Sequence, residues 1–257
     1  AKSRPPILVH KMLLLRRFTI VVTTVQTHRS SFSAPATPPN TELRGAKRQM
    51  RKEVQRSLDS LNDDDIHAES ELVSRHLSTL LDKKAQSSSR VSVYLPMQGG
   101  REVDTWPIVE DLCKRGCCVA VPQVTGKRSA DMRMASAPTF QHMRGLPLDA
   151  WHIPVPRAEW PSCEDAEVSV VLVPCVAVSK DCQRIGHGKG YYDCFIERVT
   201  AARKSAGLPP PYCVGLALRC QLLEPGRIPV GDFDQPLDAV VSPDGVWFHS
   251  QQEIQPK

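Results

Sequence analysis

Residues 184–193 have the types and spacing needed to bind a polyphosphate. They read Arg-Ile-Gly-His-Gly-Lys-Gly-Tyr-Tyr-Asp, with three glycines at alternate positions and two cations among them. Glycines allow a tight turn that brings several backbone N–H groups close to one anion. Arg184 and Lys189 would flank that anion, one as a planar fork and one as a point charge. Asp193 is suited to the Mg²⁺ that usually accompanies a polyphosphate.

This glycine-rich segment fits neither of two common nucleotide-binding motifs. It does not match GxxxxGK[ST], so a P-loop NTPase is unsupported, and it does not match the GxGxxG of dinucleotide-binding domains. A structural interpretation, in which the glycines only form a tight turn between a strand and a helix, stays open from this segment alone. A plain turn needs none of the flanking cations, tyrosines or aspartate. The segment therefore favours a nucleotide-using enzyme.

Further candidate residues gain meaning from their order along the chain. Taken singly, each is typical of a solvated surface, a cap, a turn or core packing. They are two cations one helical turn apart, two carboxylates after an expected strand, one tryptophan in a proline-rich segment and two aspartates near the last expected strand: Lys47, Arg51, Glu102, Asp104, Trp151, Asp234 and Asp238.

The elements that must position these residues predict an α/β fold, three-layered α/β/α with a mainly parallel central sheet. Apolar residues from Leu43 to Leu61 recur at helical spacing, and Asn62 then caps a second helix with three aspartates in its first turn. Strands and helices alternate afterwards, with strands expected over 91–95, 117–122, 132–135, 168–173, 212–218 and 238–242, and helices over 105–115 and 191–204. Ligands gather beyond the carboxyl ends of such strands. The strand 168–173 is expected to lead into the glycine-rich segment.

Composition limits the classes of partner. The net charge of +5 arises in residues 1–41, which hold six Lys/Arg and no acid, whereas the rest of the chain has 27 basic and 28 acidic residues. A nearly neutral body does not indicate nucleic-acid binding. The nine cysteines are odd in number and form no CxxC, so reduced thiols are expected, and a zinc site is unsupported.

Three regions are expected along the chain. Residues 1–41 have the make-up of an organelle transit peptide or disordered leader, residues 42–250 form the α/β domain, and residues 251–257 form a tail. Import into the mitochondrion is the first choice, with a plastid or a cytosolic protein with a disordered tail as alternatives. Arg16 and Arg17 interrupt the apolar stretch 12–22, and a membrane span needs ~20 apolar residues. A monomer with no membrane and no nucleic-acid partner is expected.

The order of the motifs resembles the 5-formyltetrahydrofolate cyclo-ligase family, also called methenyltetrahydrofolate synthetase, over residues 43–245. The family opens with a helix bearing Lys and, four residues later, Arg, which Lys47 and Arg51 match. A strand ending in Tyr-Leu-Pro-Met and then Glu-Val-Asp-Thr corresponds to residues 94–97 and 102–105. The arginine-led glycine segment ending Gly-Tyr-Tyr-Asp and a closing Asp-x-x-x-Asp at 234 and 238 complete the likeness.

The resemblance implies an ATP- and Mg²⁺-dependent cyclisation of 5-formyltetrahydrofolate to 5,10-methenyltetrahydrofolate. The formyl oxygen would take the γ-phosphoryl group, N10 would attack the formyl carbon, and ADP and phosphate would be released. A non-catalytic folate- or nucleotide-binding relative and an RNA-binding protein are the alternative hypotheses.

The resemblance also implies a role for each matching residue. Arg184 and Lys189 would be catalytic, and Asp193 and Asp238 would hold Mg²⁺. The other residues implied for ATP are Lys47, Arg48, Arg51, Gly186, His187, Gly188, Gly190, Tyr191 and Tyr192, together with the two catalytic cations. The folate would contact Leu95, Glu102 through hydrogen bonds to the pterin, Trp151 by stacking, and His187, Gly188, Lys189, Gly190 and Tyr191.

Overall fold

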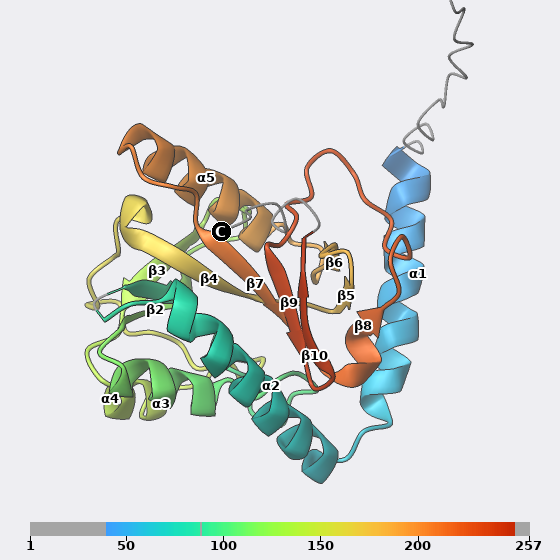
Figure 1. Ribbon diagram of the computed structural model, residues 1–257, viewed down its shortest axis with the longest axis horizontal. Coiled ribbons are helices and arrows are strands. Elements are labelled where there is room, and N and C mark those ends of the chain that lie inside the picture. Colours follow the sequence, from blue (N-terminus) through green and yellow to red (C-terminus); the bar gives the residue numbers. More distant parts are fainter. Residues whose placement is uncertain (1–39, 88, 250–257) are drawn as a thin grey trace, which may run out of the picture. The chain divides into compact units, whose positions relative to one another are not determined.

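A seven-stranded sheet runs through the part of the chain that the computed structural model describes, residues 40–87 and 89–249 (Figure 1). The strand order is β10-β9-β7-β4-β1-β2-β3. Five neighbouring strands are parallel, and β3 and β10 join antiparallel at the two edges. The bounds are β1 (Arg90–Ser92), β2 (Cys118–Val124), β3 (Met132–Ser136), β4 (Val168–Pro174), β7 (Tyr212–Leu216), β9 (Ala239–Ser242) and β10 (Gly245–Phe248). The prediction of an α/β fold with a mainly parallel sheet is confirmed.

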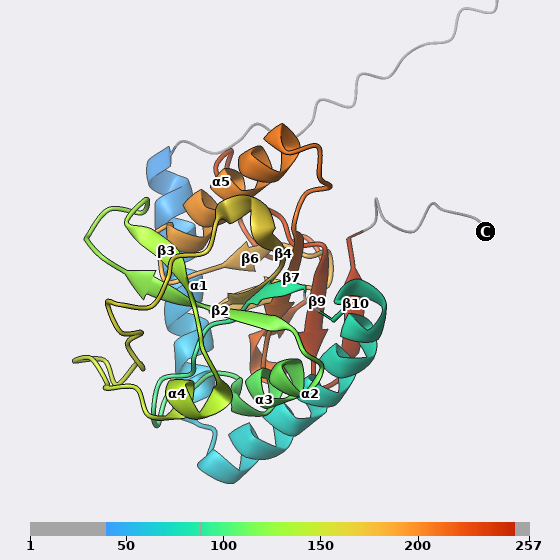
Figure 2. The same ribbon diagram turned by 90° about the vertical axis from the view of Figure 1, so that its left-hand side faces the viewer.

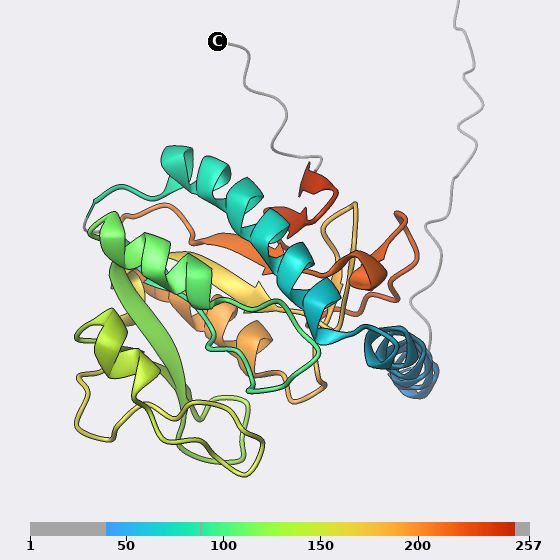
Figure 3. The same ribbon diagram turned by 90° about the horizontal axis from the view of Figure 1, so that it is seen from below.

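Helices cover both faces of this sheet (Figures 1 and 3). One face carries α2 (Asp63–Lys84), α3 (Trp106–Lys114) and the short α4 (Phe140–Arg144), and the other carries α5 (Tyr191–Ser205). Strand β4 shows why both layers are needed. Val170 and Leu172 belong to the apolar cluster under α2 and α3, whereas Val171 and Val173 belong to the cluster under α5. Alternate side chains of a strand point to opposite faces, so the continuous apolar run Val170–Val173 of β4 is buried on both.

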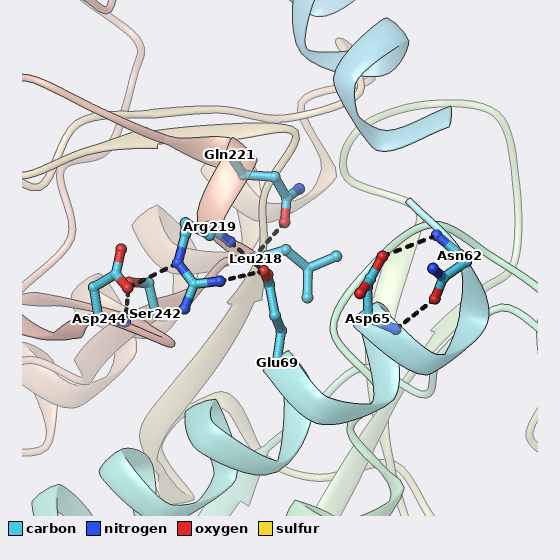
Figure 4. Close-up of polar contacts among 8 residues, drawn as sticks. All are labelled: Asn62, Asp65, Glu69, Leu218, Arg219, Gln221, Ser242 and Asp244. Carbon is cyan, nitrogen blue, oxygen red and sulfur yellow. Dashed lines mark hydrogen bonds and ion pairs between the residues drawn. The ribbon is translucent and has the colours of Figure 1, made fainter. Parts of the chain in front are cut away.

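The start of α2 lies where the sequence predicts it. Asn62 accepts a hydrogen bond from the Asp65 amide at 2.7 Å, and the Asp65 carboxylate accepts one from the Asn62 amide at 3.5 Å, which is a capping box (Figure 4). One turn later the Glu69 carboxylate accepts from the Arg219 guanidinium at 2.7 Å and from the Arg219 amide at 2.8 Å. Helix α2 is thereby tied to the short 3₁₀ helix Arg219–Gln221 that follows β7.

A second, three-stranded sheet lies beside the first one and corrects one prediction. Its order is β6-β5-β8, formed by β5 (Ala177–Ser179), β6 (Arg184–Ile185) and β8 (Leu222–Leu223). Helix α1 (Asn40–Asp59) packs against β5 and the 3₁₀ helix. It lies away from β3 in Figure 1 and runs behind the sheet in Figure 2. The glycine-rich segment therefore begins with β6 and does not follow β4 directly. Strands of two or three residues are too short to show a period in the sequence.

Helix α1 begins at Asn40, so the last two residues of the expected leader belong to the folded domain. The remainder of that leader, residues 1–39, and the expected tail 251–257 lie outside the described residues. Within 40–87 and 89–249 no helix combines the length and the apolar character needed to cross a membrane. All nine cysteines lie in the described part and are unpaired thiols, five of them buried.

Arg203 connects the end of α5 to the start of β4. Its side chain is buried, and its guanidinium donates to the carbonyls of Pro209 at 2.6 Å, Ala166 at 2.9 Å and Val168 at 3.1 Å. Burial lowers the pKa of Arg203. The three carbonyls compensate for part of that cost and fix the ends of two elements together.

We expect Arg203→Met to lower the free energy of unfolding by about 2–4 kcal/mol, because the carbonyls lose their donor inside the protein. Lys204→Met is the matched control, since Lys204 is exposed on the same turn and should change stability by less than about 0.5 kcal/mol. Urea denaturation of both variants measures the difference. Equal effects would contradict the structural role of Arg203.

Candidate active site

The glycine-rich segment connects β6 to α5 in a turn that requires glycine. Gly188 has φ +87° and Gly190, the N-cap of α5, has φ +71°. Both values lie in the left-handed region, which residues with a Cβ rarely adopt. A Cβ at Gly188 would also lie 3.3 Å from a guanidinium nitrogen of Arg51. The turn is therefore tight, as the structural interpretation of the sequence requires, and it also admits a cation against the backbone.

Helix α1 supplies that cation. Arg51 donates from Nε to the carbonyl of Gly186 at 2.7 Å, across 135 positions of sequence. Burial lowers the pKa of Arg51, and the charge of Asp234 acts in the opposite direction. Lys47, one turn earlier, forms an ion pair with Asp234 and is largely buried, whereas Arg48 is exposed on the same helix. The structure thus brings Arg51 to the glycine-rich segment, whereas Lys47 contacts the loop between β8 and β9.

A cavity of about 460 Å³ opens between α1 and the glycine-rich segment. Its lining is mainly basic and consists of Arg51, Lys52, Gln55, Arg56, Val176 and His187. Desolvation of the imidazole and the charge of Arg51 both lower the pKa of His187, so its ring is neutral at neutral pH. Lys52, Gln55 and Arg56 were missed from the sequence. Gln55 lies four residues after Arg51 and Arg56 four residues after Lys52 on the same helix, and this spacing is the signal that could have found them.

Arg184 is buried beneath the turn. Its side chain is only 4% exposed and donates from Nη2 to Asp193 Oδ1 at 2.6 Å. A Cβ at Gly186 would lie 3.0 Å from Arg184 Nη1, so this glycine lets the guanidinium pack directly under the backbone. Arg184 therefore holds Asp193 and the turn in position. A direct contact between Arg184 and a phosphate group stays a prediction.

The two aspartates expected to hold Mg²⁺ have separate partners. Asp193, in the first turn of α5, accepts from Arg184 and at 3.5 Å from the amide of Gln235. Asp238 lies at the amino end of β9, where its Oδ2 accepts from the Cys213 amide at 2.7 Å. No group of three or more His, Cys, Asp or Glu side chains suited to a metal occurs among residues 40–87 and 89–249. The joint role of the two carboxylates in binding Mg²⁺ stays a prediction.

Two of the segments expected to line the folate lie next to each other. Glu102 accepts from the Met97 amide at 2.8 Å, and Gln98 donates from its amide to the carbonyl of His152 at 2.9 Å. The segment preceding Glu102 is therefore next to the loop that carries Trp151, whose side chain is 73% exposed. Leu95 is buried and belongs to the core beneath this segment.

Glu102 is electrostatically unusual. Burial raises its pKa to about 7, the Met97 amide opposes that rise, and the nearby charge of Asp104 adds to it. A carboxyl group that changes charge near neutral pH can either accept or donate hydrogen bonds to a ligand. This property singles out Glu102 among the candidate residues of the folate side.

The two tyrosines at the start of α5 point to different surroundings. Tyr191 donates from its hydroxyl to the carbonyl of Gly126 at 3.1 Å, in the loop between β2 and β3. Ser129 of that loop lies 3.6 Å from the Cβ position of Gly190. Tyr192 instead packs edge-on against Phe195, with its hydroxyl buried. The contact of the β2–β3 loop with the glycine-rich segment was missed from the sequence, because no motif marks it. Lys189, between Gly188 and Gly190, is exposed.

Comparison with known proteins agrees with this arrangement. The model of the 5-formyltetrahydrofolate cyclo-ligase family matches residues 44–243. A 5-formyltetrahydrofolate cyclo-ligase of Saccharomyces cerevisiae is 32% identical over 218 residues, which cover 79% of this chain and 98% of the relative. A mitochondrial 5-formyltetrahydrofolate cyclo-ligase of Arabidopsis thaliana is 28% identical over 78% of this chain and 75% of the relative.

The fold is also similar to a solved structure. The 5,10-methenyltetrahydrofolate synthetase of Aquifex aeolicus superposes with a TM-score of 0.62, covering 82% of this chain and 96% of that chain at 24% identity. At this level of identity the likeness shows the α/β fold alone.

Glu102 gives a pH-dependent prediction. In the folded protein its pKa is raised to about 7 from the ordinary 4.5, so the folded state binds this proton more tightly than the unfolded state. Between these two values unfolding releases the proton, so the contribution of Glu102 to the free energy of unfolding falls as pH rises and levels off above about 7.

We therefore expect Glu102→Gln to flatten the decline in stability between about pH 5 and 7, measured by urea denaturation across that range. Glu110→Gln is the control, because Glu110 is a half-exposed partner of Lys114 on α3 and should leave the slope unchanged. A Glu102→Gln protein with the wild-type slope would show that the carboxyl group titrates in its ordinary range.

Proposed function

We propose that this chain, which belongs to the 5-formyltetrahydrofolate cyclo-ligase family, catalyses the ATP-dependent closure of 5-formyltetrahydrofolate to 5,10-methenyltetrahydrofolate, releasing ADP and phosphate. The observation that carries the proposal is the position of the glycine-rich segment. Arg51 of α1 contacts it on one side, and the β2–β3 loop contacts Gly190 and Tyr191 on the other. One turn can therefore serve two substrates at once.

The α1 side of the turn is suited to the triphosphate. Transfer of a phosphoryl group requires donors and cations that are already in place where charge develops. Arg51 and the basic cavity beside His187 provide fixed positive charge, and exposed Lys189 can reach a bound phosphate. Helix α5 adds the positive end of its dipole, because its N-cap Gly190 leaves the first amides without a side-chain acceptor.

The β2–β3 side is suited to the folate. Exposed Trp151 would stack on the pterin, and the Glu102 carboxylate would accept hydrogen bonds from the ring N–H groups. This pose would hold the formyl oxygen near the turn, where it takes the γ-phosphoryl group from ATP. N10 then attacks the formyl carbon, and phosphate leaves as the new ring closes.

Mg²⁺ is the further component of the proposal, with Asp193 and Asp238 as its candidate carboxylate ligands. Mg²⁺ commonly uses one or two carboxylates together with phosphate oxygens and water. Asp193 is 29% exposed, lies in the first turn of α5, and is held by Arg184. When bound, the ion would offset negative charge on the phosphate groups. Arg184 would act by orienting the Asp193 carboxylate.

Import into mitochondria is proposed as the location. Residues 1–41 support it, because they contain six Lys/Arg and no acidic residue. The mitochondrial relative in Arabidopsis thaliana supports it as well. A fluorescent protein fused after residue 41 tests this location in cells. Fluorescence in plastids or throughout the cytosol would reject it.

The activity is tested with the full chain, 5-formyltetrahydrofolate, ATP and Mg²⁺. We expect the ultraviolet absorbance of the methenyl product to appear and to require all three additions. Tight binding of the folate or of ATP by folded protein without any product would instead favour a non-catalytic binding protein.

Lys189→Ala should lower kcat by roughly 100-fold or more, because the transition state loses a cation at the transferring phosphoryl group. Thermal stability should stay within about 2 °C, since an exposed loop side chain supports no core packing. Lys180→Ala is the matched control: Lys180 pairs with Glu224 at the surface and should keep wild-type activity. A collapse of the melting temperature in Lys189→Ala would identify Lys189 as structural.

A further inference from the structure

We propose that Phe233 is the platform on which the adenine base of ATP stacks. The inference rests on the proposed function, because it assigns the base of the same nucleotide whose phosphates face the glycine-rich segment. Phe233 lies in the loop between β8 and β9, which the sequence motifs do not mark as an aromatic site. Its side chain is 87% exposed, more than any other large apolar side chain among the described residues.

The loop that carries Phe233 is fixed by the two residues that follow the ring. Asp234, directly after Phe233, forms an ion pair with Lys47 of α1 and accepts from the Gly231 amide at 2.7 Å. The amide of Gln235 donates to Asp193 Oδ1 at 3.5 Å, in the first turn of α5. The loop thus joins α1 to the start of α5, and Figure 1 shows this orange-red segment reaching toward α1.

Close packing at Gly231 holds the other end of the turn. A Cβ at Gly231 would lie 2.6 Å from a methyl group of Leu43, so the loop backbone rests directly on α1. The Asp234 amide also donates to the Gly231 carbonyl at 3.0 Å. Because these contacts hold the backbone on both sides of Phe233, the exposure of its ring is a feature of an anchored turn and not of a free loop tip.

The neighbours of this turn indicate a nucleotide base as the occupant. Lys47 and Asp193 both belong to the side of the site assigned to the triphosphate and its metal ion, and each contacts a residue within two positions of Phe233. The folate side has its own exposed aromatic, Trp151, beside the segment that leads to Glu102. Each half of the site therefore offers one exposed ring, and each substrate carries one flat heterocycle. Aromatic side chains stack on any nucleobase through its face.

An exposed phenylalanine is also compatible with a protein contact. Such contacts use apolar patches of several side chains. The two residues flanking Phe233 are Asp232 and Asp234, and the nearest exposed apolar side chain of the same loop is Val230. A single ring between two carboxylates is better suited to stacking on a flat ligand than to forming an apolar patch for a protein partner.

The test compares Phe233→Ala with Phe233→Tyr and the loop control Val230→Ala, each in the full chain. Loss of a base-stacking ring should raise the KM for ATP by about 5- to 100-fold, with kcat and the KM for 5-formyltetrahydrofolate within about twofold. Phe233→Tyr keeps the ring and should stay within about threefold of wild type, and Val230→Ala should be unchanged. The preference for ATP over CTP should narrow in Phe233→Ala, because a pyrimidine offers less area to stack.

A binding measurement separates this inference from the proposed function. Calorimetry with a non-hydrolysable ATP analogue should show weaker binding to Phe233→Ala than to the wild type. If the wild type forms no methenyl product but Phe233→Ala still binds the analogue more weakly, the proposed function fails and the base platform stands. An unchanged affinity and an unchanged KM for ATP would overturn the platform. A rise confined to the KM for folate would overturn it as well and assign the ring to the other substrate.

Discussion

The hydrogen bond from Arg51 Nε to the Gly186 carbonyl is the contact on which the candidate site depends. Helix α1 packs against the small sheet and the 3₁₀ helix, and its residues Val54 and Leu58 are buried. A partly buried guanidinium is costly unless it is hydrogen-bonded. The Gly186 carbonyl offsets that cost at the place where the turn needs positive charge. Because α1 also supplies the basic residues that line the cavity, the packing of α1 forms the cavity.

Charge pairing prepares the site before any ligand binds. Lys47 is held by Asp234 and Arg184 by Asp193, so each carboxylate neutralises a cation that would otherwise lie unpaired in a partly buried setting. The two pairs differ in what a nucleotide can reach. Arg184 is almost completely enclosed, so its pair keeps the carboxylate in place. Lys47 retains some exposure at the surface of α1, so in the proposed function it can face a bound triphosphate while it stays paired with Asp234.

Much of this arrangement could be predicted from local patterns. The left-handed turn at Gly188 and Gly190, the cap at Asn62 and the alternation of strands and helices each depend on neighbouring residues, and each is written in the sequence as a residue type at a fixed spacing. The features that were missed depend on contacts between distant segments. Burial of Arg184, contact of Gly126 with Tyr191, and the short strands before the turn follow from packing, for which no local pattern exists.

The start of α5 explains how one turn can serve two substrates. Successive residues of an α-helix are separated by about 100° around its axis, so residues 191 and 193 lie about 200° apart and point to nearly opposite sides. Tyr191 accordingly reaches the β2–β3 loop, whereas Asp193 reaches Arg184 and the loop that carries Phe233. Because both directions are set by the same first turn, the separation between the two halves is fixed by helix geometry. A phosphoryl group passing from one substrate to the other needs such a fixed separation, since small displacements of reacting atoms slow a reaction strongly.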